Sequence, residues 1–276
     1  MFQCNICNNN NKKLIMQKNG FDIVRCNDCG LIYVDGDITK EMLEISYNRE
    51  YYEDYYHYME RSKERERGFK ERFLEIKRII PKPKKLLEIG CAFGLFLNVA
   101  KEGGWDVYGV ELSEYSSSFA REKYGLNVKT GDLCELTLES GYDVVVMWDT
   151  IEHLIDPRKY LNEIYRILNK DGILIFHTTD LGSLGAKILG KRWSIWVPPL
   201  HLYYFTRSSI KKLLKKTGFE IVKIESRGNF FSVLFENKKI PYSVKRLFLN
   251  KYVNKTFKKL NIGHSFTVYA KKSQLF

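Results

Sequence analysis

The stretch Leu86-Leu87-Glu88-Ile89-Gly90-Cys91-Ala92-Phe93-Gly94 decides the fold of this chain. An apolar run carries an acid near its end, two glycines follow, and a helical pattern begins directly afterwards. This order predicts a strand that turns tightly into a helix, with a turn that lets the backbone approach a ligand closely. No Gly-Lys-Ser/Thr follows the glycines, which excludes a P-loop. The acid ahead of the glycines favours a cationic ligand over a pyrophosphate.

Strand and helix patterns alternate from residue 85 to residue 178. The alternation predicts a parallel sheet with helices on both faces. A helix over 206–217 and strands over 220–225 and 264–270 complete the pattern. Polar residues stand at the ends of three predicted strands: Glu111 ends 105–111, Asp132 follows 127–130, and Asp149 follows 142–148.

Together these motifs resemble the class I S-adenosylmethionine-dependent methyltransferases. Glu88-x-Gly90-x-x-x-Gly94 resembles their motif I, and the run from Thr150 to Pro157 is typical of the superfamily. The resemblance implies an α/β fold with a Rossmann-like seven-stranded sheet, whose last strand inserts antiparallel, and S-adenosylmethionine as cofactor. It implies that Glu111 holds the ribose hydroxyls. The expected cofactor-binding residues are Glu88, Gly90, Cys91, Gly94, Glu111, Leu112, Asp132, Leu133, Trp148 and Asp149.

Two cysteine pairs, Cys4-x-x-Cys7 and Cys26-x-x-Cys29, stand at the N-terminus. Their spacing is that of a zinc ribbon, in which two knuckles present four thiolates tetrahedrally. Four thiolates fill the coordination sphere, so we expect a structural Zn²⁺. A segment this short has little core of its own, and metal binding would supply its folding energy.

The motifs divide the chain into three parts. We expect the zinc ribbon over 1–39, a tyrosine-rich helical connector or lid over 40–82, and the methyltransferase domain over 83–276. The connector holds Tyr47, Tyr51, Tyr52, Tyr55, Tyr56 and Tyr58, which either cover the ligands or dock a helix. The domain carries inserts at 179–205 and 228–262. Both follow strands on the side of the sheet where ligands bind, so the first insert is expected to form a substrate wall.

His201, Tyr203 and His153 are the catalytic candidates. The ribbon, the connector and the His201-x-Tyr203 segment together resemble the nucleotide-sugar C-methyltransferases, in which a Glu-His pair serves proton abstraction. Leu200 stands here where that pair has its Glu. We therefore expect a small or sugar-like acceptor, phosphorylated or nucleotide-linked, with His201 as base and a rate that rises with pH near the ordinary histidine pKa of about 6.5.

Two alternatives stay open. Asp149-x-x-Glu152-His153 resembles the segment of ubiquinone-type O-methyltransferases that holds a divalent cation near the acceptor hydroxyl. An RNA methyltransferase or nucleic-acid-binding protein would use the ribbon and the basic C-terminal region. No Asn-Pro-Pro-Tyr motif follows the fourth strand, and no base-reading motif is present, so nucleic acid is not the expected partner.

Charge and hydropathy limit the expected partners and location of the protein. From Arg207 onward there are seventeen Lys or Arg and three acids, a net of +14 against +12 for the whole chain. Such a region suits a phosphorylated substrate or a peripheral contact with an anionic membrane, or it is simply a solvated face. No leader pattern or apolar run of eighteen residues is present, which predicts a cytoplasmic protein. The sequence does not indicate an oligomeric state.

Overall fold

A computed structural model gives the structure of the protein and describes residues 3–36, 38–39, 42–43, 63–82, 84–229, 231, 235, 241–248, 250–260 and 262–273. The tyrosines of the predicted connector, residues 47–58, lie outside the described residues, so the lid stays a prediction. The chain divides into two compact units. The first unit comprises Met1–Ile38, Asp149–Arg158 and Phe176–Phe276, and the second comprises Thr39–Trp148 and Lys159–Ile175.

A seven-stranded mixed sheet confirms the predicted fold class. Its order is β10 (Phe219–Arg227), β11 (Ser265–Lys272), β8 (Leu168–Thr179), β7 (Tyr142–Trp148), β4 (Lys85–Ile89), β5 (Asp106–Glu111) and β6 (Asn127–Thr130). The pairs β4–β5, β4–β7 and β5–β6 are parallel, whereas β10–β11 is antiparallel, as the resemblance implies. The valine run of β7, Val144 to Val146, is fully buried, as expected of a strand covered on both faces.

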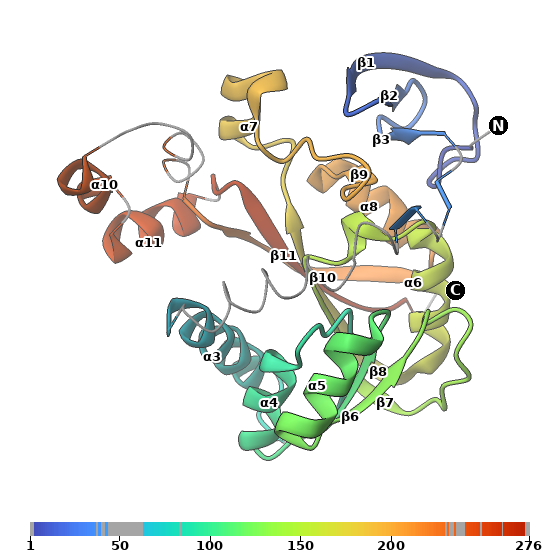
Figure 1. Cartoon of the computed structure of the whole chain (residues 1–276), viewed down its shortest axis with the longest axis vertical. Coiled ribbons are helices and arrows are strands. Elements are labelled where there is room, and N and C mark those ends of the chain that lie inside the picture. The colour runs from blue at the N-terminus through green and yellow to red at the C-terminus, as the bar shows by residue number, and fades with distance from the viewer. Residues whose placement is uncertain are drawn as a thin grey trace. The chain divides into compact units, whose positions relative to one another are not determined.

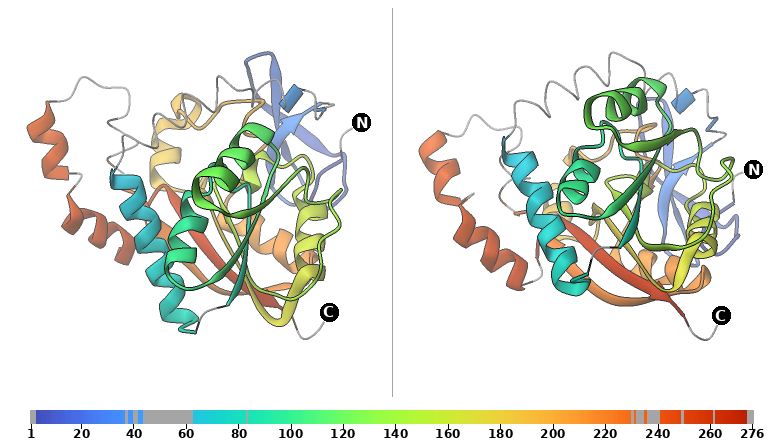
Figure 2. Two further views of the ribbon diagram at one scale, coloured as in Figure 1. Left: turned by 60° about the horizontal axis from the view of Figure 1, so that its bottom comes forward. Right: turned by 90° about the horizontal axis from the view of Figure 1, so that it is seen from below.

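Helices α3 (Lys63–Ile79), α4 (Leu95–Glu102), α5 (Glu114–Tyr124) and most of α6 (Pro157–Ile167) belong to the second unit. Helices α3 and α4 lie side by side (Figures 1 and 2), and the rings of Phe73, Phe96 and Trp105 pack edge to face between them. Helix α5 begins after Ser113, whose hydroxyl accepts the Ser116 N–H, and ends at Gly125 in the left-handed conformation. These local signals fix the helix that follows β5.

In the first unit, the N-terminal residues form a small antiparallel sheet. Strands β1 (Lys12–Lys18), β2 (Phe21–Cys26) and β3 (Ile32–Asp35) follow one another, and a fourth strand, β9 (Tyr203–Tyr204), pairs with β3 (Figure 1). Helix α8 (Arg207–Lys216) confirms the helix predicted over 206–217, and it begins after Thr206 with a capping box. The pairing of β3 with β9 is long-range, and no motif in the sequence predicts it.

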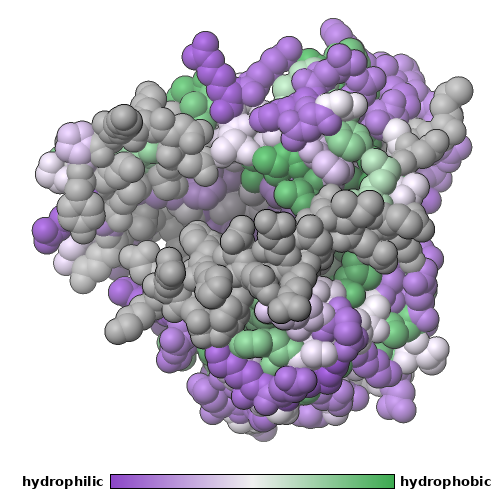
Figure 3. Space-filling model, viewed as in Figure 1, coloured by the Kyte–Doolittle hydropathy of each residue, from purple (hydrophilic) through white to green (hydrophobic). Residues whose placement is uncertain are grey.

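The two inserts are partly helical. The first contains α7 (Leu184–Leu189), and the second contains α10 (Tyr242–Phe248) and α11 (Lys251–Leu260). The Phe231 ring contacts the rings of Phe248 and Phe257 at 4.5 and 5.6 Å between centroids, which joins both helices to the preceding segment. On the face drawn in Figure 3, hydrophilic residues dominate the described surface and hydrophobic residues form smaller patches. Within the described residues, no helix has the length and apolar character needed to cross a membrane.

Candidate functional site

The loop between β4 and α4, called the β4–α4 loop (residues 90–94), turns through three left-handed residues. Gly90, Ala92 and Gly94 have φ angles of 70°, 45° and 73°. A Cβ on Gly94 would lie 2.5 Å from Leu126 Cδ1 and 3.0 Å from Ala120 Cβ, so a side chain does not fit there without displacing these two residues. Glycine at this position is therefore required twice, for conformation and for space.

Glu111 at the C-terminal tip of β5 holds this loop. Its side chain is 4% exposed. Oε2 accepts the Ala92 N–H at 2.8 Å, and Oε1 accepts the Ser113 N–H at 2.9 Å. The Gly90 N–H donates to the Val110 carbonyl at 2.8 Å. The predicted ribose ligand is thus also the residue that fixes the left-handed Ala92 against β5.

Glu88 is a second buried acid of the same unit. It is 3% exposed, and its Oε2 has no hydrogen-bond partner among the described residues. Burial raises the pKa of this carboxyl well above its usual value, although the positive charge of Arg72 opposes the shift. An acid oxygen kept dry and unpartnered suits a cationic ligand group such as an ammonium.

Arg72 is a site residue that the sequence reasoning missed. Its guanidinium lies 4.6 Å from the centroid of the Trp148 ring, one of the predicted cofactor residues. A signal was available: Arg72 stands between Phe69, Phe73 and Ile76 on the apolar stripe of α3, where a basic residue is out of place. The guanidinium of Arg72 therefore places a positive charge near Glu88 and against the Trp148 ring.

The other predicted cofactor residues of the second unit are placed at strand ends as expected. Asp132 Oδ1 accepts the Cys134 N–H at 2.7 Å. Leu133 and Cys91 are buried, whereas Leu112 directly after Glu111 is 40% exposed. Cys134 is half-buried. Asp149, however, belongs to the first unit, and its Oδ1 lies 2.6 Å from Nδ1 of His177, a residue the sequence analysis left out of the site.

Glu152, His153 and His201 lie together in the first unit and are called the histidine cluster. One ligand atom from each lies within 4.8 Å of the others. The two imidazole rings meet edge to face, with centroids 4.7 Å apart. The short helix η1 (Ile151–His153) carries the first two residues, and the insert before β9 carries the third. The sequence had singled out all three, but not their meeting.

Hydrogen bonds fix the tautomers of both histidines. His153 Nδ1 lies 2.7 Å from the Leu200 carbonyl, an acceptor, so Nδ1 carries the proton and Nε2 carries the lone pair of the neutral ring. His201 is hydrogen-bonded to the backbone of Ile195, while its buried Nδ1 has no partner among the described residues. Glu152 is 1% exposed, and its Oε2 also has no such partner. Unused polar atoms thus converge at one buried place.

Burial controls the charge of this cluster. It raises the pKa of Glu152 to about 8, with help from the nearby Asp149 charge. It lowers the pKa of His201 to about 3, with help from His153, and it lowers the pKa of His153 as well. At neutral pH both rings are therefore neutral. The expected rise in rate through about pH 6.5 is corrected, because a desolvated His201 keeps its lone pair far below that pH.

Tyr203 is 1% exposed, and its hydroxyl donates to the Ile155 carbonyl at 2.9 Å. Its catalytic role stays a prediction. The predicted cation ligands Asp149, Glu152 and His153 do not form the group that the structure brings together. His201 stands there in place of Asp149, whose carboxylate is engaged by His177.

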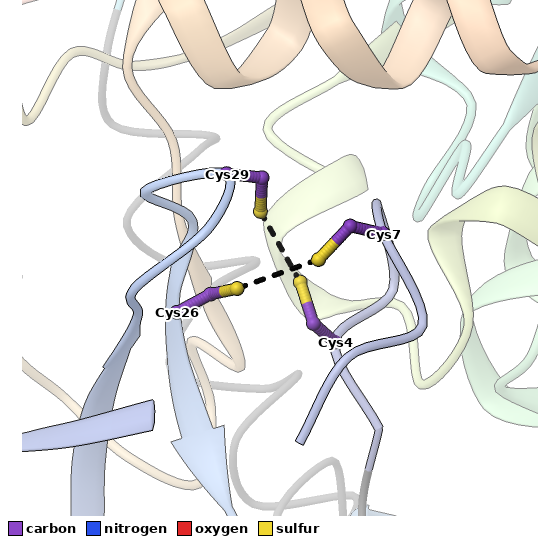
Figure 4. A group of neighbouring side chains, drawn as sticks. All are labelled: Cys4, Cys7, Cys26 and Cys29. Atoms are coloured by element: carbon purple, nitrogen blue, oxygen red, sulfur yellow. Dashed lines mark hydrogen bonds between the residues drawn. The ribbon is translucent and has the colours of Figure 1, made fainter. Parts of the chain in front are cut away.

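The four N-terminal cysteines converge as the spacing predicts. Figure 4 shows their sulfurs pointing toward a common centre from two turns of the chain. The Sγ atoms of Cys4 and Cys29 are 3.3 Å apart, those of Cys7 and Cys26 are 3.4 Å apart, and all four lie within 4.8 Å of one another. A tetrahedral Zn²⁺ with Zn–S bonds of about 2.3 Å requires sulfurs roughly 3.8 Å apart, so this donor set fits the metal.

Known proteins resemble this chain in the part that follows the cysteine cluster. A family model described as a methyltransferase domain matches residues 55–224. A ubiquinone biosynthesis O-methyltransferase of Cereibacter sphaeroides is 26% identical over 160 residues, which cover 54% of this chain and 64% of that protein. The first curated relatives are matched over 52–64% of their own length.

Solved structures share the fold. A SAM-dependent methyltransferase from Archaeoglobus fulgidus superimposes with a TM-score of 0.55 at 25% identity, over 79% of this chain and 99% of that one. The PH0226 protein from Pyrococcus horikoshii has a TM-score of 0.56 at 19% identity, over 77% and 92% of the two chains, and shows the fold alone.

Proposed function

The chain belongs to the family of methyltransferase domains, and on this premise we propose that it transfers the methyl group of S-adenosylmethionine to a hydroxyl of a small, sugar-like acceptor. The single observation that carries the acceptor side is the histidine cluster, in which a neutral His201 keeps an unused Nδ1 lone pair in a buried place. A nucleotide-linked sugar is the proposed acceptor class, because of the ribbon and the His201 segment.

The residues of the second unit fit the cofactor. Glu88 offers a buried, unpartnered carboxyl oxygen for its ammonium group, and Glu111 stands at the strand tip where the ribose hydroxyls are expected. Gly94 and the left-handed Ala92 make a tight turn in which the backbone can approach a ligand closely. The bound cofactor would supply an already activated methyl group, so alignment of the acceptor carries much of the catalysis.

His201 is suited to a hydroxyl more than to a carbon acid. A hydroxyl oxygen becomes strongly acidic as it gains the methyl group, so a base with a pKa of about 3 still takes its proton. A carbon acid must lose its proton before it attacks, which needs a stronger base. Leu200 stands in place of the Glu of the C-methylating pair, which also favours a hydroxyl acceptor over a carbon acid. Glu152, protonated at neutral pH, would donate a hydrogen bond to the acceptor.

A second candidate is metal-assisted O-methylation. It is favoured by the ligand atoms of Glu152, His153 and His201, which lie within 4.8 Å of one another, and by the relatives named as ubiquinone biosynthesis O-methyltransferases. Two imidazoles and one carboxylate leave coordination positions open for a hydroxyl. The RNA acceptor and the membrane contact of the basic region stay predictions.

Incubation with S-adenosylmethionine carrying a labelled methyl group tests the proposal. Separate pools of nucleotide-sugars, quinone precursors and RNA are offered, and the product that gains the label is identified by mass analysis. Label on a sugar hydroxyl is the expected result, whereas label on a sugar carbon would contradict the role given to His201. Calorimetry with S-adenosylmethionine alone tests the cofactor independently of any acceptor.

A further inference from the structure

Strand β9 connects the N-terminal sheet to the histidine cluster. Tyr203 and Tyr204 pair with Tyr33 and Ile32 of β3, so two residues of the insert complete the small sheet. The Val34 N–H donates to the Leu202 carbonyl at 2.8 Å. His201 directly precedes the residues that bond to β3, so the pairing with β3 restrains the position of its backbone.

The other side of the same segment is bonded to the cluster. The Leu202 N–H donates to the Glu152 carbonyl at 2.9 Å, and the Leu200 carbonyl accepts from His153 Nδ1. The residues on both sides of His201 are thus bonded to Glu152 and His153, and Leu202 bonds both to Glu152 and to Val34 of β3. The position of His201 therefore depends on β9, which pairs with β3 of the cysteine-bearing sheet.

The N-terminal sheet and its turns make further contacts within the same unit. Lys212 Nζ donates to the Cys29 carbonyl at 2.7 Å, and Asn19 Nδ2 donates to the Pro198 carbonyl at 3.0 Å. On the turn between Cys4 and Cys7, Asn5 Oδ1 accepts the Arg158 N–H at 3.1 Å. These bonds hold the N-terminal sheet and its turns to α8, to the insert and to the start of α6.

The strands β1 to β3 have a small apolar core. Its buried members apart from the cysteines are Met16, Ile23, Val24, Leu31, Tyr33 and Val34, together with Ile6 from the first cysteine turn. The burial of so few apolar side chains does not offset the entropy lost when this segment is ordered. Its structure therefore depends on a cross-link, such as the metal that the four thiols fit.

We propose that the metal-folded N-terminal sheet is a positioning element for His201, so that metal occupancy controls methyl transfer without controlling cofactor binding. Loss of the metal frees β3, β3 releases β9, and His201 leaves Glu152 and His153. The hydrogen bonds that hold the β4–α4 loop run to Val110 and Glu111, so the loop keeps its shape. The effect on turnover rests on the proposed function, but the structural coupling does not.

The first experiment compares the zinc-loaded full chain with the same chain after chelation. Hydrogen exchange measured by mass spectrometry should rise about tenfold or more in residues 198–205 on metal loss, and S-adenosylmethionine affinity should change by less than about threefold. Turnover with an accepted substrate should fall about 100-fold or more. Unchanged exchange in 198–205 would overturn the coupling, whatever the acceptor proves to be.

A variant pair keeps the proposal testable if chelation unfolds the whole chain. Asn19→Ala with Lys212→Met removes two side-chain bonds that hold the cysteine-bearing sheet, while all four cysteines remain. As a control, Lys13→Ala with Lys211→Met changes two exposed lysines, one on β1 and one on α8. With one zinc bound per chain, the first variant should exchange faster in 198–205 by about threefold or more, and the control should match the unmodified chain. Equal exchange in both variants would refute the positioning role.

Discussion

The β4–α4 loop draws its residues from a short stretch of chain and one neighbouring strand, whereas the histidine cluster joins segments that are 47 residues apart at His153 and Leu200. The loop is shaped by conformation: three left-handed residues and one carboxylate fix it. The cluster is shaped by long-range contacts, because the residues on both sides of His201 are bonded to β3 and to η1. Local geometry is visible in a sequence, and long-range pairing is not.

The largest expected effect tests the cluster. His201→Asn should slow methyl transfer by roughly 10²–10⁴-fold, the usual contribution of a positioned base, and should leave S-adenosylmethionine affinity near that of the unmodified chain. Turnover and calorimetry with purified protein measure the two quantities. Between about pH 5 and 9 the rate should not follow the titration of His201, whose pKa of about 3 lies below this range.

The metal-assisted alternative gives a different ranking. His153→Ala would then be as severe as His201→Asn, and a chelator would abolish activity even where the four cysteines retain their zinc. Full activity of His201→Asn, with loss in His153→Ala, would refute the role of His201 as base.

The next effect tests the loop. Gly94→Ala should lower the free energy of unfolding by about 2–4 kcal/mol, because the new Cβ meets Leu126 and Ala120 and the residue has a left-handed φ. Gly104→Ala is the matched control: its φ is +83°, but no atom lies within 4 Å of the new Cβ. The control should lose only about 1–2 kcal/mol of conformational strain. Equal losses in urea unfolding would show that the close packing at Gly94 is unimportant.

A smaller effect is expected at Glu111. Glu111→Ala should weaken S-adenosylmethionine binding by about 1–3 kcal/mol, through loss of the ribose ligand and of the bond that holds Ala92. Glu114→Ala, an exposed acid three residues along the chain, should leave the affinity unchanged. Calorimetric affinity that is the same in both variants would remove Glu111 from the cofactor site.

The smallest effect concerns the pH dependence of stability. The pKa of Glu152 is raised from 4.5 to about 8 in the folded chain, so the folded state retains this proton across that window. Stability should therefore fall as pH rises from about 5 to 8. In Glu152→Gln, which carries no titrating proton, this fall should be smaller by about 1 kcal/mol or more in urea unfolding at the two pH values. An identical fall in both proteins would contradict the buried, protonated state.

Much of the fold could be predicted because its signals are local. The strand containing Glu88, the capped helix after Ser113 and the acid at Glu111 are readable from residue order, and the sheet agrees with them. Four cysteines with knuckle spacing predicted their own convergence. In each case the physical cause lies within a few residues: a turn that needs glycine, a cap, or a short reach between thiols.

The tertiary structure decided which chemical groups meet. Asp149 has a left-handed φ and pairs with His177, and His201 lies beside Glu152 and His153 in a segment whose contacts are long-range. The same burial makes both histidines neutral, a property that no spacing of residues reveals. Sequence order therefore determined the fold and named the candidate residues, whereas long-range strand pairing and desolvation determined their partners and their charge.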